Sequence, residues 1–473
     1  MLNRSIYLIL APVLVLAIGL RLWAVGGDLW IDEIWSLNQI SVARASENPI
    51  DWLALFFHSN THPLNTLYLA LIGPDASNVS YRALSLLSGI AMVFMALWVG
   101  LKHSVAAGVV VTILFSLSYP LINYSGEARG YAPMMLCAIA AYGMLESYLE
   151  RPNRKFLLGF VVASVLGLMA HLTFGVFLAG FGLWALVHLF LKHRSVIKTI
   201  ARLVPIFGAQ ILLITVYGTI AFKNMVRGGD CCPEPALPSL KIMTYWTMGL
   251  DAYEVTSILP LIVFALAALI LIVIKAKEHD LSWIFYAIVI FAFPVLVLVT
   301  ETSPQVIHRY FLPTILFLLI LLSQGAGDAW AAGGWKRRGM VIFVAGFCLG
   351  QAGLLLSYSE GGRGQYGRAL ELIKNDSTSQ QRITGFPTFS VGSVFEYQTK
   401  SMGYGDALKF VPTKLEGRVA ADWFIHGYLD GKPAQVTIKR TLQTKQTHTY
   451  KLIETFPQWG LSGDAWAVYR IQR

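Results

Sequence analysis

The sequence predicts a mainly α fold: a polytopic membrane bundle of about eleven transmembrane helices, followed by a small extracytoplasmic α/β domain. Hydrophobic residues make up 55% of the chain and charged residues only 14%, whereas about a quarter of the residues in a soluble domain are charged. The apolar residues fall in runs of about 18 to 22, the length that crosses a hydrocarbon core about 30 Å thick. Most of the chain is therefore expected to have the bilayer as its solvent.

The apolar runs give the positions of the predicted spans. They cover residues 5–25, 83–101, 104–122, 131–149, 156–172, 174–191, 203–222, 257–274, 282–300, 310–323 and 339–357. The first run follows Arg4 and has the shape of a signal peptide, but it lacks a small-x-small cleavage site, so we expect it to be retained as a helix. Merging residues 156–191 into one span is the alternative, and it would reverse every later loop.

The charge of the loops predicts how these spans are oriented. With a cytoplasmic N-terminus, every inside loop is basic. The basic residues of these loops are Lys102; Arg151, Arg154 and Lys155; Lys192, Arg194, Lys198 and Arg202; Lys275 and Lys277; and Lys336, Arg337 and Arg338. The first outside loop, residues 26–82, carries six acidic residues and two arginines. This asymmetry follows the positive-inside rule and predicts a multi-pass inner (plasma) membrane protein with an extracytoplasmic C-terminus.

Composition also excludes some partners. The net charge of +10 does not indicate nucleic-acid binding, because the basic residues lie at the ends of apolar runs and not in one tract. Four cysteines in so long a chain form neither a disulfide framework nor a recognisable metal site. The adjacent Cys231 and Cys232 are expected to be free thiols or a local oxidation product.

Two domains are predicted. Residues 1–357 form the membrane domain, and within its outer loop 26–82 the segments Ile31–Ile40 and Asp51–Ile72 are expected to be interfacial helices. Beyond residue 357 no run is long enough to cross and turn residues recur, so residues 358–473 form a soluble domain. Strands are expected at Gln435–Arg440, Thr449–Ile453 and Trp466–Ile471, and a helix at Tyr366–Lys374.

Asp32 and Glu33 form the first candidate site, because they are adjacent carboxylates flanked by Trp30 and Trp35 just after the first span. In a partly dry site two such groups interact, so one can act as a base while the other pairs with a cation. The alternative is a helix start, where the dipole favours acidic residues in the first turn.

His62 begins an apolar segment of the same loop. A histidine there can donate to a phosphate or bind a metal. The alternative is an ordinary helix start, with Thr61 as the cap and Pro63 at the first helical position.

Arginines also lie at the predicted outer ends of spans, where the positive-inside rule does not account for them. Arg129 follows Glu127 before the fourth span, and Arg309 follows His308 before the tenth. The alternatives are an interfacial ion pair and a snorkelling side chain. Arg21, near the outer end of the first span, is expected to have a structural role and to pair with a carboxylate.

All these residues map to one side of the membrane. Carboxylates, arginines and a histidine at one surface match a reaction on a lipid-linked phosphate sugar, in which a base activates the acceptor and cations stabilise the departing phosphate.

At these residues the chain resembles the GT-C superfamily of membrane glycosyltransferases, especially the branch of protein O-mannosyltransferases and aminoarabinose lipid A transferases (glycosyltransferase family 39-like). The motifs that carry the resemblance are Arg21-Leu22 with Asp32-Glu33, Thr61-His62-Pro63-Leu64, Ser125 to Tyr131, and His308 to Pro313. Their order matches over most of the membrane region. The chain departs from the family at Leu64, Asn65 and Thr66, where a second proline and a tyrosine pair are common.

The resemblance implies an inverting transfer of a sugar from a polyprenyl-phosphate donor to an extracytoplasmic glycan, lipid or protein. It implies that Asp32, with Glu33 beside it, is the catalytic base. The donor-binding residues that it implies are His62, Glu127, Arg129, Tyr131, His308 and Arg309. No metal-ligand set can be assigned, although some members of the family bind a divalent cation.

Two other functions compete with this one. A transporter or flippase of a lipid-linked sugar also needs ionisable groups, but near the membrane midplane in broken helices. A non-catalytic membrane scaffold would leave the order of the motifs unexplained.

Overall fold

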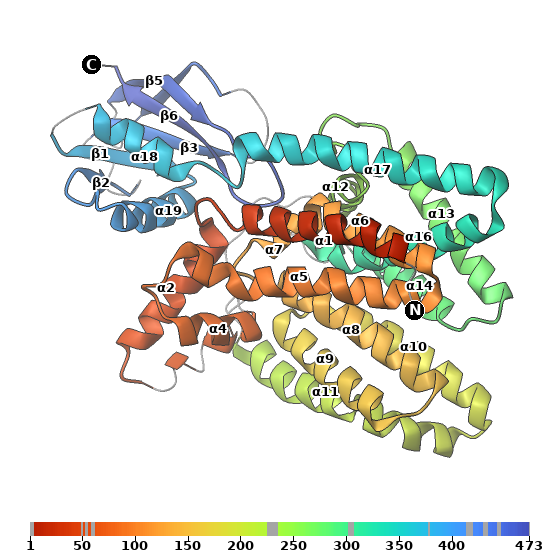
Figure 1. Ribbon diagram of the computed structural model, residues 1–473. Helices are drawn as coiled ribbons and strands as arrows, with labels where there is room; N and C mark the ends of the chain where they lie inside the picture. Colours follow the sequence, from red (N-terminus) through yellow and green to blue (C-terminus); the bar gives the residue numbers. More distant parts are fainter. Residues whose placement is uncertain are drawn as a thin grey trace. The chain divides into compact units, whose positions relative to one another are not determined.

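The computed structural model describes residues 4–48, 51–52, 55–57, 62–224, 235–300, 307–376, 379–412, 420–428, 434–441 and 446–472. The chain divides into two compact units (Figure 1). The first, the membrane unit, comprises Met1–Val25 and Ala43–Leu354, and the second, the C-terminal unit, comprises Gly26–Val42 and Leu355–Arg473.

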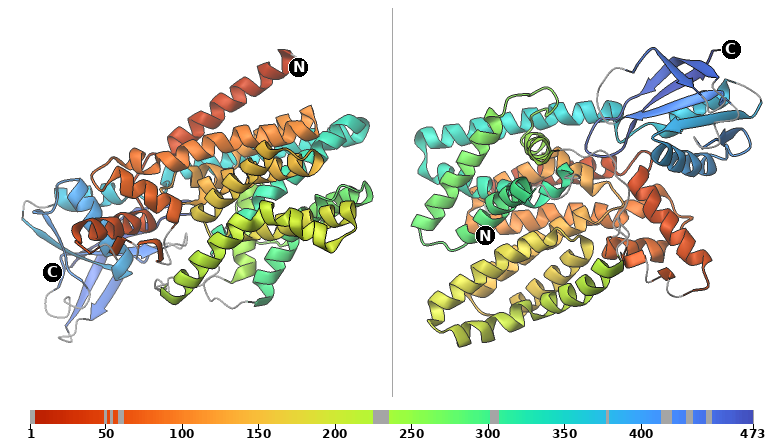
Figure 2. Two further views of the ribbon diagram at one scale, coloured as in Figure 1. Left: turned by 90° about the horizontal axis from the view of Figure 1, so that it is seen from below. Right: turned by 180° about the vertical axis from the view of Figure 1, so that it is seen from behind.

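The membrane unit consists of helices that pack side by side, both with their neighbours in the chain and with helices farther along it (Figures 1 and 2). They are α1 (Arg4–Ala24), η1 (Leu55–Phe57), α4 (Pro63–Ile72), α5 (Asn78–His103), α6 (Val105–Leu117), α7 (Tyr119–Ser125), α8 (Tyr131–Glu150), α9 (Arg154–Ala170), α10 (Phe174–His193), α11 (Val196–Asn224), α12 (Ala236–Thr247), α13 (Leu259–Lys277), α14 (Trp283–Ala287), η2 (Ile288–Ala292), α15 (Phe293–Thr300), η3 (His308–Phe311), α16 (Leu312–Ala332) and most of α17 (Gly334–Gly361).

The predicted fold class is confirmed, and each predicted span coincides with a helix or a run of helices. Eight of the described helices are long and apolar enough to cross a membrane, and α6 with α7 forms a ninth candidate, bent by 61°. The other two predicted spans correspond to α1 and to α9, which has 17 residues. The chain is a multi-pass membrane protein.

Helix α16 forms the centre of the membrane unit. Every residue from Leu312 to Gln324 is buried, as expected of a helix that is apolar all round. Aromatic rings pack against it: Phe285 meets Phe317 edge-on at 4.6 Å and stacks on Phe181 at 4.7 Å.

The C-terminal unit contains a six-stranded sheet in the order β2-β1-β3-β6-β5-β4. Its strands are β1 (Gln381–Phe386), β2 (Leu408–Phe410), β3 (Trp423–Tyr428), β4 (Thr437–Thr441), β5 (Thr447–Phe456) and β6 (Ala465–Ile471). β1 runs parallel to β2 and β3, and the other pairs are antiparallel. Helices α18 (Tyr366–Asn375) and α19 (Thr388–Ser401) pack against the sheet (Figure 1). The predicted strands and helix of this region coincide with β4, β5, β6 and α18.

The first part of the outer loop, residues 26–42, belongs to the C-terminal unit. Helix α2 (Ile31–Ala45) begins there, and the contacts of residues 26–42 group this segment with residues 355–473. The sequence placed all of 26–82 in the membrane domain, because sequence proximity was the only guide to its packing.

Candidate active site

The site of interest is built on the break between α6 and α7. Pro120 has no N–H and disfavours a helical conformation in the residue before it, so a continuous helix cannot pass through this point. An unbroken helix would join the N–H of Tyr119 to the carbonyl of Phe115. Here that carbonyl accepts from Arg21 Nη2 at 2.9 Å, and the Tyr119 N–H donates to Gln351 Oε1 at 2.8 Å.

Arg21 and Gln351 therefore hold the break. Both side chains are completely buried, and an unsatisfied backbone group in a membrane costs several kcal/mol. Gln351 also donates to the carbonyls of Trp246 and Thr247, at 3.0 and 2.8 Å. Arg21 additionally donates to its own helix at the Ala17 carbonyl. Among the described residues this guanidinium thus bonds backbone carbonyls, whereas the sequence suggested a carboxylate.

The break delivers a buried turn, residues 126–130, to the start of α8. Close packing fixes this turn: a Cβ on Gly130 would lie 1.9 Å from the Ala170 carbonyl oxygen, at the end of α9. Ser85 Oγ donates to the Arg129 carbonyl at 2.9 Å, and Asn65 Nδ2 donates to that of Ala128 at 2.8 Å. Asn65 thus anchors α4 to the turn at a position where the chain departs from the family pattern.

Aromatic and basic side chains gather around the ring of Tyr131. The centroids of His171, Tyr124 and His62 lie 4.9, 5.0 and 5.4 Å from that of Tyr131. The guanidinium carbons of Arg309 and Arg129 lie 5.9 and 6.0 Å from it. We call these six residues the Tyr131 cluster. They come from α7, α8 and η3, from the N-cap of α4, and from the turns before α8 and α10.

Both imidazoles of the Tyr131 cluster are neutral at physiological pH. Burial, and then the charges of Arg129 and Arg309, lower the pKa of His171 to about 3. Burial followed by the same arginines and His171 holds the pKa of His62 well below its usual value. His171 Nδ1 accepts the Thr173 N–H at 3.1 Å, so its proton resides on Nε2.

Two buried polar atoms of the cluster make no hydrogen bond within the described part of the chain. His62 Nε2 and the Tyr124 hydroxyl have no hydrogen-bond partner among the described residues, and Tyr124 is fully buried. Buried polar groups in native proteins are almost always paired. His62 hydrogen-bonds the Ala170 backbone, so its neutral ring has its proton on Nδ1 and its Nε2 is an acceptor. The Tyr124 hydroxyl, two guanidinium groups and the Nε2–H of His171 are the donors that describe a site for an anion.

Four residues singled out in the sequence meet in the Tyr131 cluster: His62, Arg129, Tyr131 and Arg309. Glu127 lies in the same buried turn and accepts from Asn123 Nδ2 at 2.8 Å. His308 precedes Arg309 in η3 and is half-buried. Thr61, Cys231 and Cys232 lie outside the described residues.

The two candidate catalytic carboxylates lie in the C-terminal unit, on the first turn of α2. Glu33 is completely buried, and its Oε2 accepts the Trp30 N–H at 3.2 Å, as in an acidic helix start. Asp32 beside it is half-buried.

His171 was not singled out from the sequence. It is one histidine in the short break between two apolar runs, and a lone histidine carries little signal. What could have pointed to it is the break itself, which separates α9 from α10 at the same end of the bundle as the other motifs.

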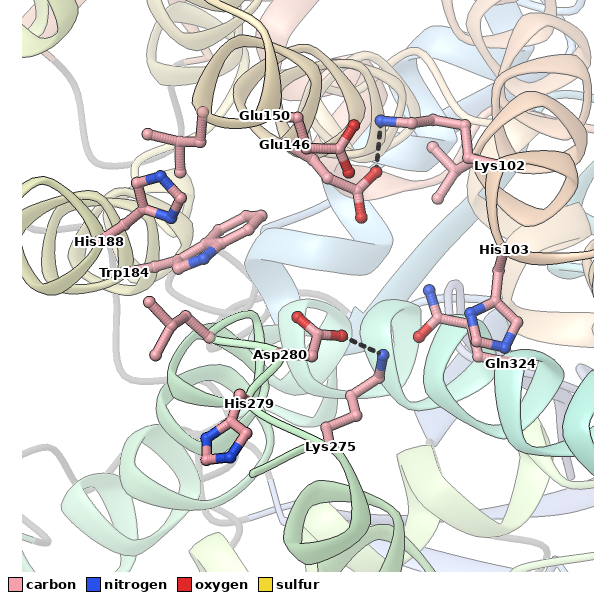
Figure 3. Close-up of a pocket in the computed structure, with 13 residues that line it drawn as sticks. Lys102, His103, Glu146, Glu150, Trp184, His188, Lys275, His279, Asp280 and Gln324 are labelled. Atoms are coloured by element: carbon pink, nitrogen blue, oxygen red, sulfur yellow. Dashed lines mark hydrogen bonds and ion pairs between the residues drawn. The ribbon is translucent and has the colours of Figure 1, made fainter. Parts of the chain in front are cut away.

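A cavity lies at the end of α8 opposite Tyr131 (Figure 3). Its volume is about 560 Å³, and its lining residues Glu146 and Glu150 are near the end of α8, the helix that Tyr131 begins. Lys102 Nζ lies 2.5 Å from Glu146 Oε2, and Lys275 Nζ lies 2.8 Å from Asp280 Oδ2. We call it the Lys102 cavity. Its lysines are already paired with carboxylates, so an anion would have to displace them.

No group of three or more His, Cys, Asp and Glu residues within the described ranges could hold a metal ion. A divalent cation, which the family resemblance allows, therefore has no ligand set among these residues.

Comparison with known proteins identifies the fold. No protein-family model and no curated protein matches the sequence. The structure is similar to the crystal structure of ArnT from Cupriavidus metallidurans in the apo state, with a TM-score of 0.51 and 11% sequence identity over 98% of this chain and 97% of that chain. The chain has the ArnT fold. Because the match covers nearly all of both chains, the ArnT fold includes the C-terminal unit as well as the helices.

Proposed function

We propose that the protein is an inverting glycosyltransferase that moves a sugar from a polyprenyl-phosphate donor to an extracytoplasmic acceptor. The observation that carries the proposal is the Tyr131 cluster, in which two guanidinium groups, the Nε2–H of His171 and a buried Tyr124 hydroxyl without a partner among the described residues lie around one ring. The fold supports it, because ArnT is an aminoarabinose lipid A transferase of the GT-C fold.

In the proposed reaction Asp32 removes a proton from the acceptor hydroxyl or amine. The acceptor atom then attacks the anomeric carbon from the face opposite the phosphate, and the bond from this carbon to the phosphate oxygen breaks. The leaving polyprenyl phosphate keeps the electron pair of that bond. Arg129, Arg309 and the Nε2–H of His171 stabilise the charge that develops on its oxygens.

The proposal places the site at the inner membrane's extracytoplasmic face. It rests on the loop charges, which put the N-terminus in the cytoplasm and the C-terminal unit outside. The acceptor class, whether glycan, lipid or protein, would be read from envelope glycolipids and glycans compared with and without this protein by mass spectrometry.

Transfer by the purified protein, reconstituted with a polyprenyl-phosphate sugar, tests the function. Asp32→Asn is expected to bind donor and remain folded but to lose transfer, and turnover retained in this variant would exclude Asp32 as the base. Donor that crosses the bilayer of a proteoliposome without an acceptor would instead favour the flippase alternative.

A further inference from the structure

Within the C-terminal unit, residues 355–473 contact the acidic segment 26–42 on both sides of Asp32. Four residues before it, Asp28 Oδ2 accepts the Gly367 N–H at 2.8 Å. Three residues after it, the Trp35 ring meets Phe389 edge-on at 5.6 Å and 75°. Residues more than 300 positions apart in the chain are thus joined next to the candidate base.

The Asp28 contact is a helix cap supplied from elsewhere in the chain. Gly367 is the second residue of α18, where backbone N–H groups have no partner within the helix. A carboxylate at a helix N-terminus is favoured both by these N–H groups and by the helix dipole. A Cβ on Gly367 would lie 3.6 Å from Asp28 Oδ2, so the carboxylate packs directly on the backbone here.

A further carboxylate, Asp464, stands near this segment. Its backbone N–H donates to the Tyr366 hydroxyl at 2.8 Å, and the buried Tyr366 ring packs on Trp466 at 4.7 Å. Burial, and then the negative charge of Asp32, raise the pKa of Asp464 to about 6. The charges of Asp28 and Glu33 help to raise the pKa of the buried Tyr366 hydroxyl. The backbone carbonyl of Arg363 packs closely on Gly463.

We propose that the C-terminal domain holds the acidic segment 26–42 in place. It positions Asp32 through the Asp28–Gly367 and Trp35–Phe389 contacts. This inference rests on the proposed function, in which Asp32 is the base, and it gives the C-terminal domain a part in transfer that no sequence motif assigns.

The Trp35–Phe389 contact provides the first test. Phe389 is 61% exposed, so Phe389→Ala is expected to leave the domain folded while kcat falls about tenfold and the donor KM is unchanged. Trp35→Ala should have the same effect, and the double variant should be no worse than either. Ile453→Ala, an exposed residue (46%) of the same domain, is the matched control. Unchanged kcat in Phe389→Ala, or additive losses in the double variant, would overturn the proposal that this contact positions Asp32.

Hydrogen exchange separates this inference from the proposed function. In the full-length protein, the amides of Ile31–Ala45 should exchange faster in Phe389→Ala than in the wild type or Ile453→Ala. This readout requires no transfer, so a wild type without activity would refute the proposed function and leave the positioning testable. Equal exchange in all three proteins would refute the positioning.

Discussion

The Tyr131 cluster and the Lys102 cavity occupy opposite ends of the same helices. Tyr131 begins α8 and Glu146 lies 15 residues later (146 − 131), a rise of about 22 Å. In the Lys102 cavity each lysine lies against its own carboxylate. In the Tyr131 cluster the fully buried hydroxyl of Tyr124 has no hydrogen-bond partner among the described residues. A charged cavity is therefore not by itself a site; the useful signal is polarity that the protein leaves unsatisfied.

The largest difference between the two regions is expected for their cations. Arg309→Ala should lower the kcat/KM of transfer about 10²- to 10³-fold, because it removes a charged donor to the departing phosphate. Lys102→Ala should change it by less than about threefold, because its ammonium stabilises Glu146 and not the substrate. Steady-state transfer assays would measure both, and similar losses in the two variants would remove the distinction between the regions.

Gln351→Leu probes the support of the Tyr131 cluster. It removes hydrogen bonds to Tyr119, Trp246 and Thr247 and should lower the unfolding free energy by about 2–3 kcal/mol, with a loss of about tenfold in kcat/KM. Gln324→Leu, a buried glutamine of the Lys102 cavity, is the matched control. It should lose stability but keep its kinetics. If both variants lose only stability, Gln351 does not position the site.

The buried imidazoles predict a loss of stability in acid. Their pKa values are lowered in the folded protein, so their contribution is fully present above the unfolded pKa of about 6.5 and is lost as the pH falls below it. Between pH 7.5 and 5, His171 should contribute a loss of about 2 kcal/mol. Thermal unfolding in detergent would measure this loss, and His171→Phe should show a weaker dependence on pH. An unchanged dependence would mean that His171 is not buried in its neutral form.

The smallest effect is expected for the ion pair of the Lys102 cavity. Lys102→Met leaves Glu146 without its cation and should cost about 1 kcal/mol of unfolding free energy, since the pair is only partly buried. Adding Glu146→Gln should recover most of that loss. Thermal unfolding again serves as the measurement, and a larger loss in the double variant would show that Glu146 is stabilised by other groups.

Apolar run length predicted the helices well, because the thickness of the hydrocarbon core restricts what can cross it. His62, Arg129 and Arg309 could be found because polar motifs at span ends stand out against apolar neighbours. Gln351 could not, because a single glutamine in α17 acquires its role only from a break in α6–α7 more than 200 residues away. The packing of residues 26–42 against residues 355–473 was missed for the same reason. A contact such as Asp28–Gly367 leaves no local pattern in the sequence.

Equilibrium binding of a polyprenyl phosphate without sugar is the most direct test of the central claim that the Tyr131 cluster holds the donor phosphate. Wild type, Arg309→Ala and Lys102→Ala would be compared in the same nanodiscs. Binding should be equal in wild type and Lys102→Ala and at least about 100-fold weaker in Arg309→Ala. Undiminished binding in Arg309→Ala, or loss of binding in Lys102→Ala, would contradict the account.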